Sequence, residues 1–156
     1  SVRDNLLLAV QARAGSSFRC LRRRAAETAL MDGALALADK VGLGEVLDRP
    51  AGTLAHGMQK RLDVALALAA RPKLLLLDEP MAGMGPEDSV HMITLIDRLR
   101  REVAILLIEH DMDAVFQLAD RISVLVYGKV LTSGDAAHVR GHAEVQAVYL
   151  GTAAPA

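Results

Sequence analysis

Aromatic residues are scarce in this chain, which has 156 residues, no tryptophan and only 3% aromatic content. Modules that hold nucleic-acid bases by stacking need exposed aromatic side chains, so the composition disfavours that class of protein. The opposite charges nearly cancel, with 18 basic and 19 acidic residues and a formal net charge of -1, which argues against a general nucleic-acid binder. The hydrophobic content of 52% must therefore come mainly from aliphatic residues packed between helices and a sheet.

Cysteine and long apolar segments are also scarce. Cys20 is the only cysteine, so the chain cannot form an internal disulfide, and a reducing compartment is expected. The longest apolar runs, such as residues 64–70, fall far short of the roughly 18 residues that a membrane-spanning helix needs. The first residues show no signal-peptide pattern. We therefore expect no direct membrane insertion, and a chain of this kind that works at a membrane is brought there by a partner.

Residues 1–71 show helical periodicity. Ser1 and Asp4 form a candidate capping box at the start of a first helix. Gly42 is a candidate end for a second helix, and a third helix is predicted from Gly57 to about residue 70, where Arg71-Pro72 stops it. This part of the chain is predicted to be a helical subdomain.

Residues 72–156 alternate between strand and helix patterns instead. Apolar runs at 74–77 and 103–108 predict two strands of a parallel sheet, joined by a helix that Pro86 opens. The remaining expected elements are a short helix capped by Asp111, a β-hairpin over 122–132 with its turn at Gly128-Lys129, and a helix over 136–150. The sequence therefore predicts an α/β fold, in which the helical subdomain precedes a partial parallel sheet with flanking helices and a C-terminal hairpin.

Four leucines at 74–77 run directly into Asp78, Glu79 and Pro80. An apolar run of this kind predicts a strand buried on both faces, whose carboxyl end lies where open α/β sheets bind their ligands. Two adjacent acids are costly to bury there unless a cation or a proton-transfer role compensates them. The alternatives are therefore a metal-nucleotide site and a core strand that simply ends in a solvated acidic turn. If strand geometry continued, Glu79 would point away from Asp78.

Three stretches in order resemble the C-terminal part of an ATP-binding cassette (ABC) ATPase, over essentially the whole chain. Residues 54–58 resemble the family's signature motif, 74–80 its Walker B strand, and 81–86 its D-loop, while His110 stands where the family has its switch histidine. The wording of residues 81–86, 107–112 and 148–151 is similar to that of the ATP-binding subunits of branched-chain amino acid importers.

The resemblance implies roles for particular residues. Asp78 would hold Mg²⁺, Glu79 would act as general base on the attacking water, and His110 would hydrogen-bond the γ-phosphate. Gly85 would take part in the D-loop. The signature residues would face ATP held by a second ATP-binding subunit; they are Leu54, Ala55, His56, Gly57 and Met58.

The motifs depart from the family's usual pattern at four positions. Ala55 replaces a serine, His56 a glycine and Met58 a glutamine, while Gly85 replaces an Asp or Asn. The changes at Ala55 and Met58 weaken side-chain contact with phosphate but leave the backbone donors of a helix start. The change at Gly85 puts coupling between subunits in doubt.

A phosphate-binding loop of the form G-x-x-x-x-G-K-[ST] is absent from the sequence. The only Gly-Lys pair, Gly128-Lys129, is followed by Val130 and has Ser123 where the first glycine would stand, so we interpret it as a hairpin turn. The resemblance places the family's phosphate-binding loop before Ser1, and the chain is expected to be a portion of a cassette.

The resulting hypothesis is an ATP-hydrolysing subunit of an ABC importer, with ATP and Mg²⁺ as cofactors and branched-chain amino acids as the transported substrate. Its partners would be a second ATP-binding subunit and transmembrane permease subunits, with no nucleic acid. It would lie in the cytoplasm, on the inner face of the membrane. The isolated chain is expected to be inactive, because it lacks the phosphate-binding loop. The alternatives are a catalytically inactive binding or dimerisation module, and a soluble ABC ATPase of repair or translation.

Overall fold

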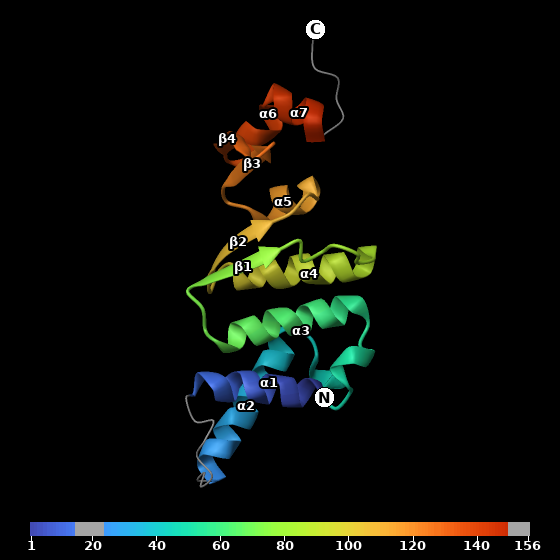
Figure 1. Cartoon of the computed structure of the whole chain (residues 1–156), viewed down its shortest axis with the longest axis vertical. Coiled ribbons are helices and arrows are strands. Elements are labelled where there is room, and N and C mark those ends of the chain that lie inside the picture. Colours follow the sequence, from blue (N-terminus) through green and yellow to red (C-terminus); the bar gives the residue numbers. More distant parts are fainter. Residues whose placement is uncertain (15–23, 150–156) are drawn as a thin grey trace. The chain divides into compact units, whose positions relative to one another are not determined.

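The computed structural model describes residues 1–14 and 24–149, which fall into two compact units, Ser1–Leu106 and Leu107–Ala156 (Figure 1). Cys20 and the closing residues 150–156 lie outside the described residues. The predicted boundary after residue 71 falls inside the first unit and stays a prediction.

Helix α1 (Val2–Arg13) begins with the predicted capping box. The Ser1 hydroxyl accepts a hydrogen bond from the Asp4 amide at 3.2 Å and donates one to the Asp4 carboxylate at 2.8 Å. The bond from Ser1 lowers the pKa of Asp4, because it favours the charged carboxylate. The Val2 amide donates to the Arg49 carbonyl at 3.0 Å. The start of α1 therefore has its backbone donors satisfied, both locally and by a distant loop.

Helix α2 (Arg24–Lys40) ends two residues before the predicted glycine, Gly42, which terminates it. Gly42 has a φ of 71°, and its amide donates to the Asp39 carbonyl at 3.1 Å, while the Leu43 amide donates to the Ala38 carbonyl at 2.8 Å. These two bonds form a Schellman motif, which needs the left-handed backbone that glycine adopts freely. Two short 3-10 helices follow, η1 (Gly44–Val46) and η2 (Ala51–Thr53).

Helix α3 (His56–Ala69) leads into the predicted strand–helix–strand unit, formed by β1 (Leu74–Asp78), α4 (Pro86–Leu99) and β2 (Ala104–Ile108). Strands β1 and β2 pair in a two-stranded parallel sheet (Figure 1). Helix α3 packs against α1, α2 and α4. The α/β class and the change from helices to a strand–helix–strand unit are thus confirmed.

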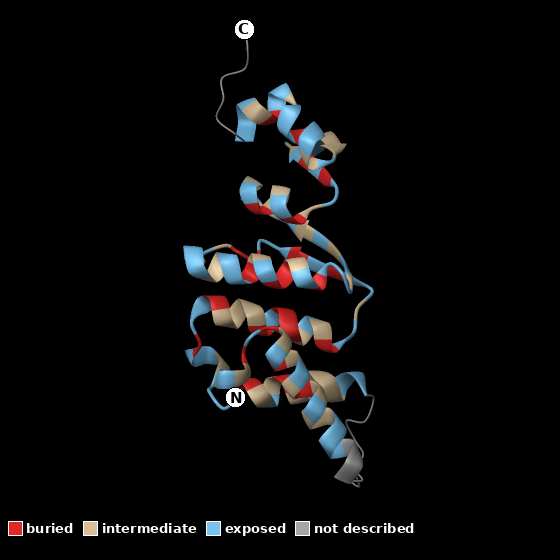
Figure 2. Cartoon of the chain, turned by 180° about the vertical axis from the view of Figure 1, so that it is seen from behind, coloured by how far each residue is buried: buried red, intermediate tan, exposed pale blue. Residues whose placement is uncertain are grey.

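Strand β1 differs from the prediction in its burial, because only one of its faces is covered. Leu75 and Leu77 are 4% and 8% exposed, whereas Leu74 and Leu76 are 52% and 66% exposed. Helix α4, which joins the two strands, carries the buried residues Met92, Leu95, Ile96 and Leu99 (Figure 2). The expectation of a strand buried on both faces is therefore wrong for this chain, since the described residues supply one covering layer and the sequence pattern is suited to two.

The second unit contains α5 (Met112–Leu118), β3 (Ile122–Val126), β4 (Lys129–Gly134), α6 (Ala136–Gly141) and α7 (Ala143–Tyr149). Asp111 caps α5 as predicted, with its carboxylate accepting the amides of Asp113 and Ala114. A hydrophobic cluster holds the unit together, with Ile122, Val124, Val139 and Val145 buried at its centre.

Two predicted boundaries in this unit need correction. The hairpin turns at Tyr127-Gly128, one residue earlier than expected. These two residues have φ angles of 48° and 74°. A two-residue turn with positive φ at both positions matches the twist of the strands that it joins. The helix expected over 136–150 is divided at His142, whose ψ of 118° is extended. Gly141 directly before it has low helix propensity, which weakens the helix at that point.

Candidate functional site

The two predicted acidic residues lie at the carboxyl end of β1. Asp78 is the last residue of the strand, and both it and Glu79 are exposed. Glu79 has a φ of 44°, so the strand's alternation stops at Asp78 and cannot be used to predict where the Glu79 side chain points. A left-handed backbone at a residue other than glycine is strained, and such strain gathers at functional sites. The structure thus corrects the assumption of continued strand geometry.

The signature residues surround the start of α3. Ala55 is the N-cap and makes no side-chain hydrogen bond, and the helix begins at His56, one residue before the predicted Gly57. The first amides of an α-helix have no partner within the helix. Because no side chain caps them here, this helix start keeps the backbone donors that the family resemblance assigns to phosphate. Leu54 is buried at 5% exposure, whereas Ala55 and His56 are exposed.

The loop after β1 contacts the start of α3 within the first unit. The His56 Nε2 atom lies 3.3 Å from the Ala82 carbonyl oxygen, with Gly83 beside the ring. Gly57 is covered by Asp88 of α4, because a Cβ added to Gly57 would lie 2.6 Å from both carboxylate oxygens. These contacts were not predictable from the sequence: Asp88 is recognisable as an acid in the first turn of a helix, but periodicity does not reveal its neighbours in space.

Gly85 is the N-cap of α4 and has a φ of -73°, which any residue adopts. A Cβ at this position would meet no atom within 4 Å. The glycine is therefore required neither by backbone conformation nor by close packing, and the Asp or Asn usual in the family would fit here without steric cost.

His110 belongs to the second unit, where it follows β2. Its side chain is 69% exposed, and Nδ1 lies 3.8 Å from a carboxylate oxygen of Glu109, whose own side chain is 1% exposed. The His110 amide also donates to that carboxylate at 3.2 Å. The Glu109 carboxylate therefore contacts both the backbone amide and the ring of His110, the predicted switch histidine. The exposed imidazole is accessible to a ligand.

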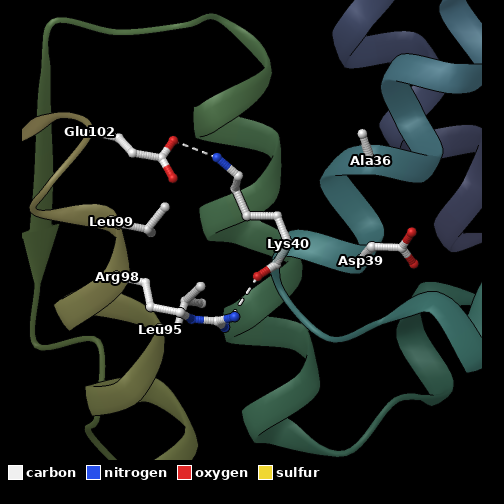
Figure 3. Close-up of a pocket in the computed structure, with 7 residues that line it drawn as sticks. All are labelled: Ala36, Asp39, Lys40, Leu95, Arg98, Leu99 and Glu102. Atoms are coloured by element: carbon white, nitrogen blue, oxygen red, sulfur yellow. Dashed lines mark hydrogen bonds and ion pairs between the residues drawn. The ribbon is translucent and has the colours of Figure 1, made fainter.

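One pocket, of about 320 Å³, lies between α2 and α4 (Figure 3). Lys40 forms an ion pair with Glu102 across it, and Arg98 donates a hydrogen bond to the Lys40 carbonyl at 3.4 Å. None of the predicted site residues lines it. The ion pair joins α2 to the turn after α4 and, being exposed, contributes on the order of 0–1 kcal/mol to stability. We therefore do not assign the candidate site to this pocket.

Within residues 1–14 and 24–149, no group of three His, Cys, Asp or Glu side chains is arranged to hold a metal ion. Asp78 still has a suitable oxygen donor, because Mg²⁺ in nucleotide sites is bound by one or two carboxylates together with substrate phosphates. Nor does any helix among the described elements have the length and apolar character needed to cross a membrane.

Known proteins share both the sequence and the fold. The family model described as "ABC transporter" matches residues 2–82. The high-affinity branched-chain amino acid transport ATP-binding protein BraF of Pseudomonas aeruginosa is 41% identical over 132 residues, which cover 83% of this chain and 52% of that protein. The corresponding protein LivG of Escherichia coli is 39% identical, with the same coverage. The chain therefore spans about half the length of these relatives.

Solved structures agree with this assignment. The ATP-binding cassette MJ1267 of an ABC transporter superposes with a TM-score of 0.77 at 25% identity, covering 96% of this chain and 62% of that one. Another, cbiO1 from Clostridium perfringens, part of the ABC transporter complex cbiONQ, has a TM-score of 0.70 at 27% identity and covers 88% of this chain and 54% of that one. With a family model matched over more than half its residues, the chain belongs to the ABC transporter family.

Proposed function

We propose that this chain supplies the signature motif, the Walker B strand and the switch histidine of the ATP-hydrolysing subunit of an ABC importer for branched-chain amino acids. The observation that carries the proposal is the acidic pair at the end of β1, where Glu79 has a strained φ of 44°. The choice of cargo is supported by the names of relatives that are 39% and 41% identical to this chain.

The carboxylate chemistry supports a division of roles. Asp78 is an exposed hard oxygen donor, suited to Mg²⁺ that is shared with nucleotide phosphates. When bound, Mg²⁺ would neutralise charge on the transferred phosphoryl group. Glu79 would orient and deprotonate the attacking water, and His110 would donate a hydrogen bond to the γ-phosphate.

The signature residues support a composite site. The start of α3 has no side-chain cap, so its amides and helix dipole favour an anion. In this proposal the anion is the ATP of a second ATP-binding subunit, and hydrolysis is coupled to permease subunits in the membrane. The chain would then lie on the cytoplasmic face of that membrane through its partners.

The isolated chain should release no phosphate from ATP, because it has no phosphate-binding loop to hold the nucleotide. Steady-state phosphate release by the purified chain would measure this. Release that disappears in Glu79→Gln would contradict the proposal, since activity would then come from this chain alone.

The role assignments can be tested in a cassette completed by residues that carry the phosphate-binding loop. Glu79→Gln and His110→Ala should each lower kcat by about 10²-fold or more, the effect expected for loss of a general base or of a transition-state donor. The matched controls are Glu87→Gln and His91→Ala, which change an exposed acid and an exposed histidine on α4. Near-normal turnover in both site variants would rule out these roles, and a completed cassette without any activity would favour a binding module.

A further inference from the structure

The first turn of α3 contacts the loop after β1 at a point that connects to the strained Glu79. The His56 Nε2 atom lies 3.3 Å from the Ala82 carbonyl oxygen. Because a carbonyl oxygen only accepts hydrogen bonds, Nε2 must carry the proton and donate it. The Ala82 amide in turn donates to the Glu79 carbonyl at 3.1 Å. A series of two hydrogen bonds thus runs from the imidazole to the residue with the left-handed backbone.

The surrounding loop leaves this carbonyl available. The loop's second internal bond runs from the Met84 amide to the Met81 carbonyl at 3.1 Å, so neither of these loop bonds uses the Ala82 oxygen. Gly83 has a φ of 75°, and a Cβ there would lie 3.5 Å from His56 Nε2, so the ring lies beside this turn. The imidazole therefore packs on the loop as well as bonding to it.

A second, independent contact joins the first turn of α3 to the start of α4, the helix that follows the loop. Asp88, in the first turn of α4, has its carboxylate against Gly57, which is buried. A negative charge near the first turn of α3 is favoured by the helix dipole. Neighbouring residues of one helix turn, His56 and Gly57, thus contact the loop and the helix that follows it.

We propose that His56 is a positioning residue that acts through Ala82 to hold Glu79 in its left-handed conformation. A strained backbone persists only where its surroundings restrain it, and the bond from His56 supplies such a restraint from outside the loop. A displacement of the first turn of α3, which carries the signature residues, would then be transmitted to Glu79, the candidate general base. This functional consequence rests on the proposed ATPase role, whereas the contact itself does not.

Amide hydrogen exchange of the 156-residue chain tests the proposal without any activity measurement. His56→Phe keeps a ring but removes the donor, and should raise the exchange rate of the Ala82 amide by about threefold to fivefold, as expected for loss of one exposed hydrogen bond. His56→Gln supplies a side-chain N–H donor again and should restore the rate to within about twofold. The matched control is His91→Phe, at an exposed histidine on α4, which should leave the Ala82 rate unchanged.

Three results would overturn the proposal: an unchanged Ala82 rate in His56→Phe, equal acceleration in His56→Phe and His56→Gln, or uniform acceleration throughout α3 and α4. The last result would mean general destabilisation rather than positioning. Failure of the ATPase proposal would be seen in a different experiment. A completed cassette that shows no activity would leave the hydrogen-exchange results for this chain unchanged.

Discussion

Helix α1 and strand β1 belong to the same compact unit but differ in how completely the described residues satisfy them. Helix α1 begins with a reciprocal capping box, and its inward residues Val2 and Leu6 are 0% exposed. Strand β1 has two leucines more than half exposed, Leu74 and Leu76, and ends in a residue with strained φ. The start of α3, which carries the signature residues, has no side-chain cap. The first backbone donors of α1 and its inward side chains are thus satisfied, locally and by the loop at residues 47–49, whereas the start of α3 lacks such a cap and one face of β1 lacks cover among the described residues.

This difference teaches where local rules give way to function. Sequences generally agree with their fold at every level, and the exceptions concentrate at sites that bind or react. Here the exceptions are an uncapped helix start and a left-handed glutamate. Each exception can be removed or exaggerated by one substitution, so the comparison is open to direct test.

The largest expected effect is a difference in stability between substitutions on the two faces of β1. Leu75→Ala removes a side chain that is 4% exposed and should cost about 2–5 kcal/mol of unfolding free energy, whereas Leu76→Ala, at 66% exposure, should change it by less than about 0.5 kcal/mol. Urea denaturation measures both, with Leu6→Ala in α1 as a fully buried reference. Equal losses in Leu75→Ala and Leu76→Ala would show that the open face is covered in solution.

The strain at Glu79 should give the next effect. Glu79→Gly and Glu79→Ala both remove the carboxylate, but only glycine adopts a φ of 44° freely. We expect Glu79→Gly to be more stable than Glu79→Ala by about 1–2 kcal/mol, the cost of a left-handed backbone for a residue with a Cβ. Thermal unfolding of the pair measures the difference. Indistinguishable midpoints would mean that Glu79 carries no backbone strain.

A side-chain cap at the start of α3 should make this helix start more stable, as the capping box does for α1. In Ala55→Ser the new hydroxyl can accept an amide from the first turn, which should add about 1 kcal/mol of stability. The control is Ala67→Ser, at an exposed position inside α3, where serine has lower helix propensity than alanine and should not stabilise. No gain in Ala55→Ser would show that the amides at this helix start are already satisfied.

The smallest effect is expected at the start of α4. Gly85→Asn replaces one N-cap residue by a better one in open space, and should raise stability by a few tenths of a kcal/mol. Gly83→Ala provides the contrast, because its φ of 75° makes any Cβ unfavourable and the variant should lose stability. A loss in Gly85→Asn, measured by thermal unfolding, would indicate that this loop tolerates no side chain.

Local patterns predicted those parts of the fold that depend on near neighbours in the sequence. The capping box of Ser1 and Asp4, the helix end at Gly42 and the cap at Asp111 all involve residues within five positions of each other. Such bonds follow from residue type and spacing alone. The strand of leucines and the proline that opens α4 were likewise predictable, and the α/β class followed from their order.

The remaining features depend on contacts that periodicity does not contain. The cover over only one face of β1 depends on which layers surround the sheet, and the φ of Glu79 depends on a turn that begins one residue after the strand. The contacts of His56 with Ala82 and of Asp88 with Gly57 join segments about 30 residues apart. The assigned roles of Asp78, Glu79 and His110 stay predictions, because they came from resemblance and await the kinetic tests.

The half-covered sheet has a consequence for biosynthesis. When this chain is synthesised on its own, α1 to α3 can pack before β1 appears, and Leu74 and Leu76 are exposed in the structure that results. Exposed leucines on a two-stranded sheet are the kind of surface that chaperones bind and that promotes aggregation. Yield of this chain in cells should therefore depend on chaperone supply more than its well-packed helices alone would suggest.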